Sequence, residues 1–107
     1  MRTHADIDRR SLELARAIAA KIDRDPERCG LLNARRVCAR WRQSSPLSVL
    51  SEWQRILECS WEDVRRVLLR DDEDGRRLRQ SSPFCSVLTV RERWALYRKA
   101  THESNAT

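Results

Sequence analysis

Turn-forming residues are scarce in this chain of 107 residues, which contains two glycines and three prolines. Ordinary proteins contain about 7% glycine and about 5% proline. A β-sandwich or a barrel needs a turn every 8–12 residues or so, and so few turn formers cannot supply them. The sequence therefore predicts an all-α fold, a compact bundle of about five helices in a single domain.

Long apolar runs are also missing. No stretch approaches the roughly 18 residues that cross a bilayer, so we expect no membrane association through a spanning helix. The first residues, 1–8, contain no apolar stretch of the kind found in secretory signal peptides. Both absences favour a cytoplasmic protein.

Lysine is rare, whereas arginine is abundant. Lys21 and Lys99 are the two lysines among 22 basic residues, so 20 are arginines, and the formal net charge is +6. Arginine binds carboxylate and phosphate groups with two parallel hydrogen bonds. The bias therefore favours an acidic protein partner or nucleic acid, while codon usage in a GC-rich genome explains the arginine content equally well.

Motifs for catalysis and cofactor binding are absent. Gly30 and Gly75 alone cannot form a phosphate-binding loop or a dinucleotide fingerprint. His4 and His102 lie near the two ends, where they are poorly placed for a Ser–His–Asp or Cys–His arrangement. We expect a protein that is not an enzyme and that takes no cofactor.

The four cysteines are not arranged as metal ligands. Cys29, Cys38, Cys59 and Cys85 are widely and irregularly spaced, with no C-x-x-C pair. The acidic run at 71–74 lacks the alternating spacing of a calcium loop. We expect buried, reduced thiols and no metal site.

Capping patterns predict where several helices begin. Asp8 is expected to cap the first helix, and Asp25-Pro26 to end it and open the second. Capping boxes at Ser60 and Thr89 predict two further helix starts. The run at 71–75 should end one helix and begin the next turn.

Apolar residues at helical spacing predict the core. We expect flexible ends at 1–7 and 101–107 around a helical domain at 8–100. The predicted core comprises Leu12, Ile18, Ile22, Leu31, Leu50, Trp53, Leu57, Trp61, Val64 and Leu68.

Two basic clusters are predicted to bind a partner or nucleic acid, because arginine and tryptophan are enriched at binding hot spots. For Trp41, as for Trp94, a place in the core is the other interpretation. The segment at 81–88 is interpreted as a phosphate-contacting loop, as a plug in which Phe84, Val87 and Leu88 fill the core, or as both together. The clusters comprise Arg35, Arg36, Arg40, Trp41 and Arg42, and then Arg76, Arg77, Arg79, Gln80, Ser81, Ser82, Arg91 and Arg93.

A longer pattern spans most of the chain. It comprises Arg77-Leu78-Arg79-Gln80-Ser81-Ser82-Pro83-Phe84, Val87-Leu88-Thr89 and Arg91-Glu92-Arg93-Trp94, with Asn33-Ala34-Arg35, Glu52-Trp53 and Ile56-Leu57 upstream. This pattern resembles small bacterial helical proteins of the antitoxin or accessory-gene type. The resemblance implies a protein that binds a partner protein or DNA.

Three functions remain open. The first is an antitoxin or inhibitor that binds an acidic toxin or effector. The second is a DNA-binding regulator with a helix-turn-helix formed by 60–70 and 76–80, although four acidic residues between them would repel phosphate. The third is a phage-type inhibitor of a nucleic-acid-handling complex. The sequence leaves homodimerisation open. If Arg77 and Arg79 lie on the surface, their reversal to glutamate should weaken binding and leave the melting temperature unchanged.

Overall fold

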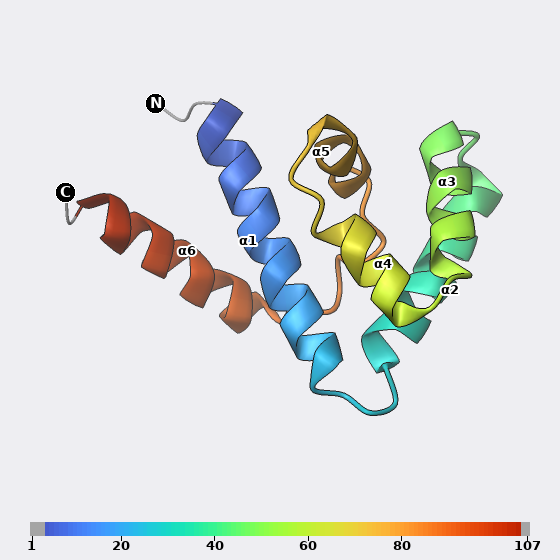
Figure 1. The fold of residues 1–107 in the computed structure, drawn as a ribbon, viewed down its shortest axis with the longest axis horizontal. Helices are drawn as coiled ribbons and strands as arrows, with labels where there is room; N and C mark the ends of the chain where they lie inside the picture. Colours follow the sequence, from blue (N-terminus) through green and yellow to red (C-terminus); the bar gives the residue numbers. More distant parts are fainter. Residues whose placement is uncertain (1–3, 106–107) are drawn as a thin grey trace.

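Six helices make up most of the computed structural model, which describes the backbone of residues 4–105 and the side chains of residues 6–99. They are α1 (His4–Asp23), α2 (Cys29–Ser44), α3 (Ser48–Leu57), α4 (Trp61–Leu68), α5 (Glu73–Arg79) and α6 (Val90–Asn105). No strand occurs among the described residues, so the all-α prediction is confirmed. In Figure 1, α1 separates α6 from the group formed by α2, α3, α4 and α5.

The two outer helices are longer than the sequence predicts. Helix α1 begins at His4 and not at Asp8, and α6 continues to Asn105, past the predicted end at 100. Asp8 is therefore inside α1 and does not cap it. Its Oδ2 atom lies 3.3 Å from Nε of Arg76, so this carboxylate pairs with α5.

The turn between α1 and α2 also differs from its prediction. Helix α2 begins at Cys29, three positions beyond the expected Pro26, because the Asp25 carboxylate accepts the backbone N–H of Cys29 at 2.8 Å. Arg28 adopts a left-handed conformation with φ 53°. Its Nη1 atom donates to the carbonyl of Ile22 at 2.7 Å, satisfying one of the last carbonyls of α1.

Both predicted capping boxes begin helices. The Ser60 hydroxyl accepts the Asp63 N–H at 3.4 Å at the start of α4. At the start of α6, Thr89 Oγ1 accepts the Glu92 N–H at 3.1 Å, and Glu92 Oε1 accepts the Thr89 N–H at 2.9 Å. The second box satisfies two backbone donors reciprocally.

The acidic run opens α5, as expected. The Asp72 carboxylate accepts the Gly75 N–H at 2.8 Å and also pairs with Arg70 at 2.7 Å. Gly75 is required here by a close approach, since a Cβ atom would lie 2.2 Å from the Arg70 carbonyl oxygen.

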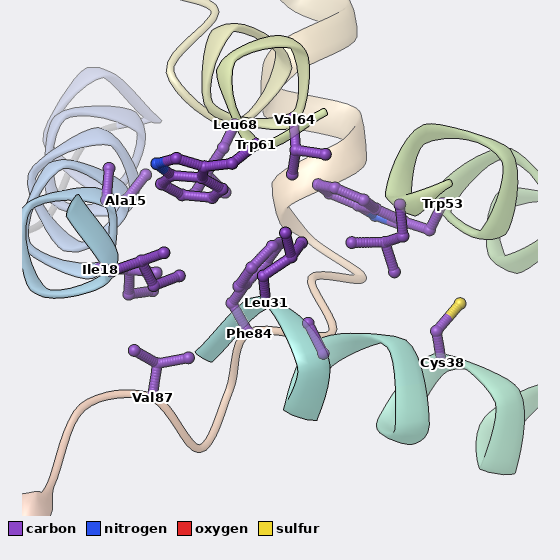
Figure 2. Close-up of a cluster of buried hydrophobic side chains, with 14 of the residues drawn as sticks. Ala15, Ile18, Leu31, Cys38, Trp53, Trp61, Val64, Leu68, Phe84 and Val87 are labelled. Atoms are coloured by element: carbon purple, nitrogen blue, oxygen red, sulfur yellow. The ribbon is translucent and has the colours of Figure 1, made fainter. Parts of the chain in front are cut away.

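Every residue predicted for the core is buried. Figure 2 shows Phe84 entering the centre of this cluster from the coil that follows α5. Its ring meets the edge of Trp53 at 5.9 Å between centroids, and Trp53 Nε1 donates to the Leu78 carbonyl at 2.8 Å. Val87 and Leu88 are also buried, so the plug interpretation of 81–88 is confirmed.

Helix α6 packs mainly against α1, and its Leu96 side chain reaches the edge of the core. The radius of gyration, 14.4 Å, exceeds the value of about 13 Å for a compact chain of this length. Lys21 holds the start of α6, since its Nζ atom donates to Glu92 Oε1 at 2.7 Å and to the Val87 carbonyl at 2.8 Å. Beyond this attachment the two helices diverge in Figure 1.

Candidate binding groove

A groove with a volume of about 1040 Å³ lies between α1 and α6, and its base is formed by the ends of α4 and α5 and by the coil before α6. The α1 wall is made by residues 7, 10, 11, 14, 15 and 18, which repeat at helical spacing and share one face. That face is about three turns long, roughly 16 Å at 1.5 Å per residue. The α6 wall is made by Arg93, Trp94, Tyr97 and Arg98.

The groove is apolar from its base to part of its rim. Leu68, Phe84 and Leu88 are buried at the base. Ile7 on α1 and Trp94 on α6 are 53% and 59% exposed, one on each wall. Large exposed apolar side chains that line a concave surface are typical of binding sites.

The charge of the groove has one sign. Four arginines line it, whereas none of its described lining residues is acidic. Arg10 lies over the Tyr97 ring, 5.5 Å from its centroid, and Arg93 donates to the Cys85 carbonyl. The other two are Arg79 and Arg98. A concave surface with one sign of charge concentrates its field and attracts the opposite charge.

Arg79 is not on the surface, contrary to the sequence-based expectation. Its side chain is 9% exposed, and it donates from Nη1 to the carbonyls of Leu68 at 3.1 Å and Arg70 at 2.5 Å. Its Nε atom donates to Ser11 Oγ at 3.0 Å. Burial lowers the pKa of the guanidinium, although arginine stays charged in proteins. The surface position expected for Arg79 is therefore wrong, and its reversal to glutamate should destabilise the protein.

Two neighbouring arginines, the half-buried Arg76 and the exposed Arg77, are paired with carboxylates. Arg77 binds both carboxylate oxygens of Glu52, at 2.7 and 3.0 Å. This pair lowers the pKa of Glu52. Arg76 pairs with Asp8 and lies 4.0 Å from Asp71. Because Arg76 and Arg77 are paired and Arg79 is buried, these three arginines do not form one exposed basic cluster.

The remaining predicted residues of this segment are divided between the groove and the outer surface. Gln80 is exposed and lines the groove, as does the half-buried Ser82, whose hydroxyl accepts the Phe84 N–H at 3.2 Å. Ser81 is half-buried and Arg91 is exposed, and neither lines the groove.

The predicted cluster on α2 is a separate surface. Arg35 Nε donates to the Leu57 carbonyl at 2.7 Å, and Arg42 donates to the Gln54 side chain. Arg36 and Arg40 are exposed, with no ion pair to any described side chain, and Trp41 is half-buried. In Figure 1, α2 lies at the opposite end of the molecule from α6, the helix that carries Arg91 and Arg93. The α5 part of the second cluster is nearer to α2, since Arg77 and Arg42 contact Glu52 and Gln54 of α3.

The cysteines differ in exposure. All four thiols are free. Cys38 is the buried one, and its Sγ atom lies 3.4 Å from the Leu50 carbonyl oxygen. Cys29, Cys59 and Cys85 are exposed, so the expectation of buried thiols is wrong for these three. Among the described residues no three metal-ligating side chains lie together.

Sequence reasoning missed the groove because its walls are about 80 positions apart in the chain. The α1 residues Arg10, Ser11 and Leu14 and the α6 residues Tyr97 and Arg98 were not predicted as site residues. One signal was present: Trp94 lies in a helix whose other apolar residues are few, which is unusual for a core position.

Comparison with protein-family models, curated proteins and solved structures finds no match to this chain. Within residues 4–105, no helix combines the length and hydropathy needed to span a bilayer.

Proposed function

We propose that this protein is a binding module that inhibits or neutralises a partner protein by taking an acidic, amphipathic helix of that partner into the groove between α1 and α6. The observation that carries the proposal is the lining of the groove, which combines apolar walls with four arginines and no acidic residue among those described. An inhibitor or antitoxin that occupies an effector would act in this way.

The dimensions of the groove suit a helix better than a small molecule. Pockets for small molecules occupy about 300–1,000 Å³ and enclose most of the ligand. This groove is at the upper limit of that range, and its α1 wall offers one continuous face. A partner helix of about three turns would cover that face, with apolar anchors at i, i+3, i+4 and i+7.

The charge of the groove selects an acidic helix. Arg10 and Arg98 line the walls near the exposed Ile7 and Trp94 side chains, where the polar face of an amphipathic helix would pass. Complementary charge of this kind increases the association rate and disfavours basic partners.

The groove also favours binding over catalysis. Its described lining contains no histidine and no carboxylate, the side chains that most often act as general bases. Ser11, Ser82 and Cys85 line the groove with potentially nucleophilic side chains, but no histidine or carboxylate among the described lining residues could activate them.

DNA binding by the predicted helix-turn-helix is the weaker candidate. Of the three arginines in its second segment, 76–80, Arg76 and Arg77 are paired with carboxylates and Arg79 is buried. Exposed Asp71 and Glu73 lie at the start of α5, where they would repel phosphate.

The proposal is tested with two designed peptides of about 18 residues, long enough for an amphipathic helix. Both carry leucine at helical spacing, and the polar face is glutamate in one and lysine in the other. We expect calorimetry to detect binding of the glutamate peptide alone. Equal binding of the two peptides, or no binding of either, would contradict the proposal.

A matched pair of variants locates the site. Trp94 lines the groove, whereas Val90, also on α6 and 72% exposed, does not. Trp94→Ala should weaken binding of the glutamate peptide about tenfold or more, as loss of a hot-spot tryptophan does. Val90→Ala should leave it unchanged. Equal effects of the two substitutions would place the site elsewhere.

A further inference from the structure

The guanidinium of Arg79 is held rigidly, yet one end of it has no acceptor. Nη1 donates to two carbonyls at the end of α4, and Nε donates to Ser11. Nη2 is buried and has no hydrogen-bond partner within the protein. A buried charged donor without an acceptor is costly, so the position of Arg79 calls for a partner.

The carboxylates around Arg79 are bound to other arginines. Asp8, Asp71 and Asp72 all act on its charge. Asp8 lies 3.3 Å from Arg76 Nε, and Asp72 lies 2.7 Å from Arg70 Nη2. Asp71 lies 4.0 Å from Arg76. Arg79 therefore has no carboxylate of its own.

Arg79 and Ser11 both line the groove. The Ser11 oxygen already accepts from Arg79 Nε at 3.0 Å, so its hydroxyl proton can be donated elsewhere. In this lining, Arg79 has an Nη2 group without an acceptor and Ser11 has a hydroxyl proton to donate. Such a pair matches the two oxygens of a carboxylate.

We infer that Arg79 and Ser11 receive one carboxylate of the partner helix, an aspartate or glutamate in the middle of its apolar face. This inference rests on the proposed function and adds to it the chemical identity of the residue at the centre of the partner's apolar face. The arginines on the walls attract the acidic face of the partner, whereas Arg79 selects the residue at the centre of the interface.

With Arg79 in place, the groove should prefer a central glutamate to a central leucine, which is the reverse of what an apolar groove usually prefers. Leucine at the centre of the partner's apolar face would normally bind more tightly than glutamate, because burying a carboxylate without a partner costs free energy. With Arg79 beneath it, glutamate gains a charge-assisted hydrogen bond, and leucine leaves the guanidinium unsatisfied.

The test uses three peptides that differ at one central position of the leucine face, which carries glutamate, glutamine or leucine. The polar face is glutamate in all three. For the unmodified protein we expect the central glutamate to bind about tenfold or more tightly than the central leucine, with glutamine between them. Binding of the leucine peptide as tightly as the glutamate peptide, or more tightly, would overturn the inference and leave the proposed function intact. Failure of all three to bind would overturn both.

Two substitutions that keep the positive charge test whether Arg79 causes the preference for a central glutamate. In Arg79→Lys, checked for native helicity by circular dichroism, the preference for glutamate should fall about tenfold, because lysine lacks the branched donors. In Arg93→Lys, a wall residue, the preference should be unchanged. An unchanged preference in Arg79→Lys would overturn the assignment. Should that variant unfold, the three peptides with the unmodified protein still decide the matter.

Discussion

The two faces of α1 have opposite surroundings. On one face, Ala19 and Ile22 pack into the buried core with α2, α4 and the coil that carries Phe84. On the other, Ile7 and Leu14 line a groove whose opposite wall diverges from α1. The first face packs against several elements of the core, whereas α6 contacts α1 through the Lys21–Glu92 pair and through the stacking of Arg10 on Tyr97.

The buried face of α1 contributes to the stability of the fold, whereas the open face is available for binding. A buried apolar face stabilises the native state through packing, so its residues cannot change without cost. An open apolar face adds little to stability and remains available to a partner. Arg79 belongs to both regions, since three hydrogen bonds from Nε and Nη1 join it to α1 and to the end of α4, and its side chain also lines the groove.

The largest effect is expected inside the core. Phe84→Ala removes a fully buried ring that contacts Trp53, and should lower the free energy of unfolding by about 3–5 kcal/mol. Urea unfolding followed by circular dichroism measures this loss. A loss smaller than about 1 kcal/mol would show that the coil is not part of the core.

Next in size is a comparison of two arginines in α5. Arg79→Met leaves the Leu68 and Arg70 carbonyls without their donor, and should destabilise the protein by about 2–3 kcal/mol. Arg77→Met breaks an exposed pair with Glu52 and should change stability little. Thermal melts of the two variants test the difference. Equal melting temperatures would contradict the interior placement of Arg79.

A smaller, local effect is expected from acid. The Lys21 ammonium, together with the Thr89 N–H, holds the pKa of Glu92 at about 2, below its ordinary 4.5. Because the folded-state pKa is the lower one, this contact stabilises the attachment of α6 above about pH 4.5 and loses that contribution as the pH falls towards 2. NMR shifts of α6 amides should change over this range. In Glu92→Gln that change should disappear, and its persistence would refute the role of this contact.

The smallest effect is expected on the open face. Trp94→Ala and Val90→Ala should each change the free energy of unfolding by no more than about 0.5 kcal/mol, because both side chains are mostly exposed. Chemical denaturation of both variants checks this. A large loss in Trp94→Ala would mean that the groove is a packed part of the core.

Local patterns in the sequence predicted much of the fold. The capping boxes at Ser60 and Thr89 operate within four residues, and helical spacing identified Trp53, Trp61 and their neighbours as core. The start of α1 at His4 was missed because Asp8 has the side chain of a capping residue, while its carboxylate pairs with Arg76 in the fold.

The site was predicted less well because it depends on contacts between distant parts of the chain. Sequence pattern treats every arginine as exposed, so it could not separate Arg79 from Arg77, two positions away. Of the predicted residues, the groove brings together Arg79, Gln80, Ser82 and Arg93. Its α1 wall has the pattern of a core face, and only the divergence of α6 leaves that face open.

The most direct test of the groove as the binding site is NMR mapping with the glutamate peptide, using backbone amides of the labelled protein. We predict that the perturbed amides fall in two sets, residues 7–18 of α1 and 93–98 of α6, with the amides of α2 unchanged. Perturbations centred on Arg36 and Arg40 of α2, with none in those two sets, would contradict the account.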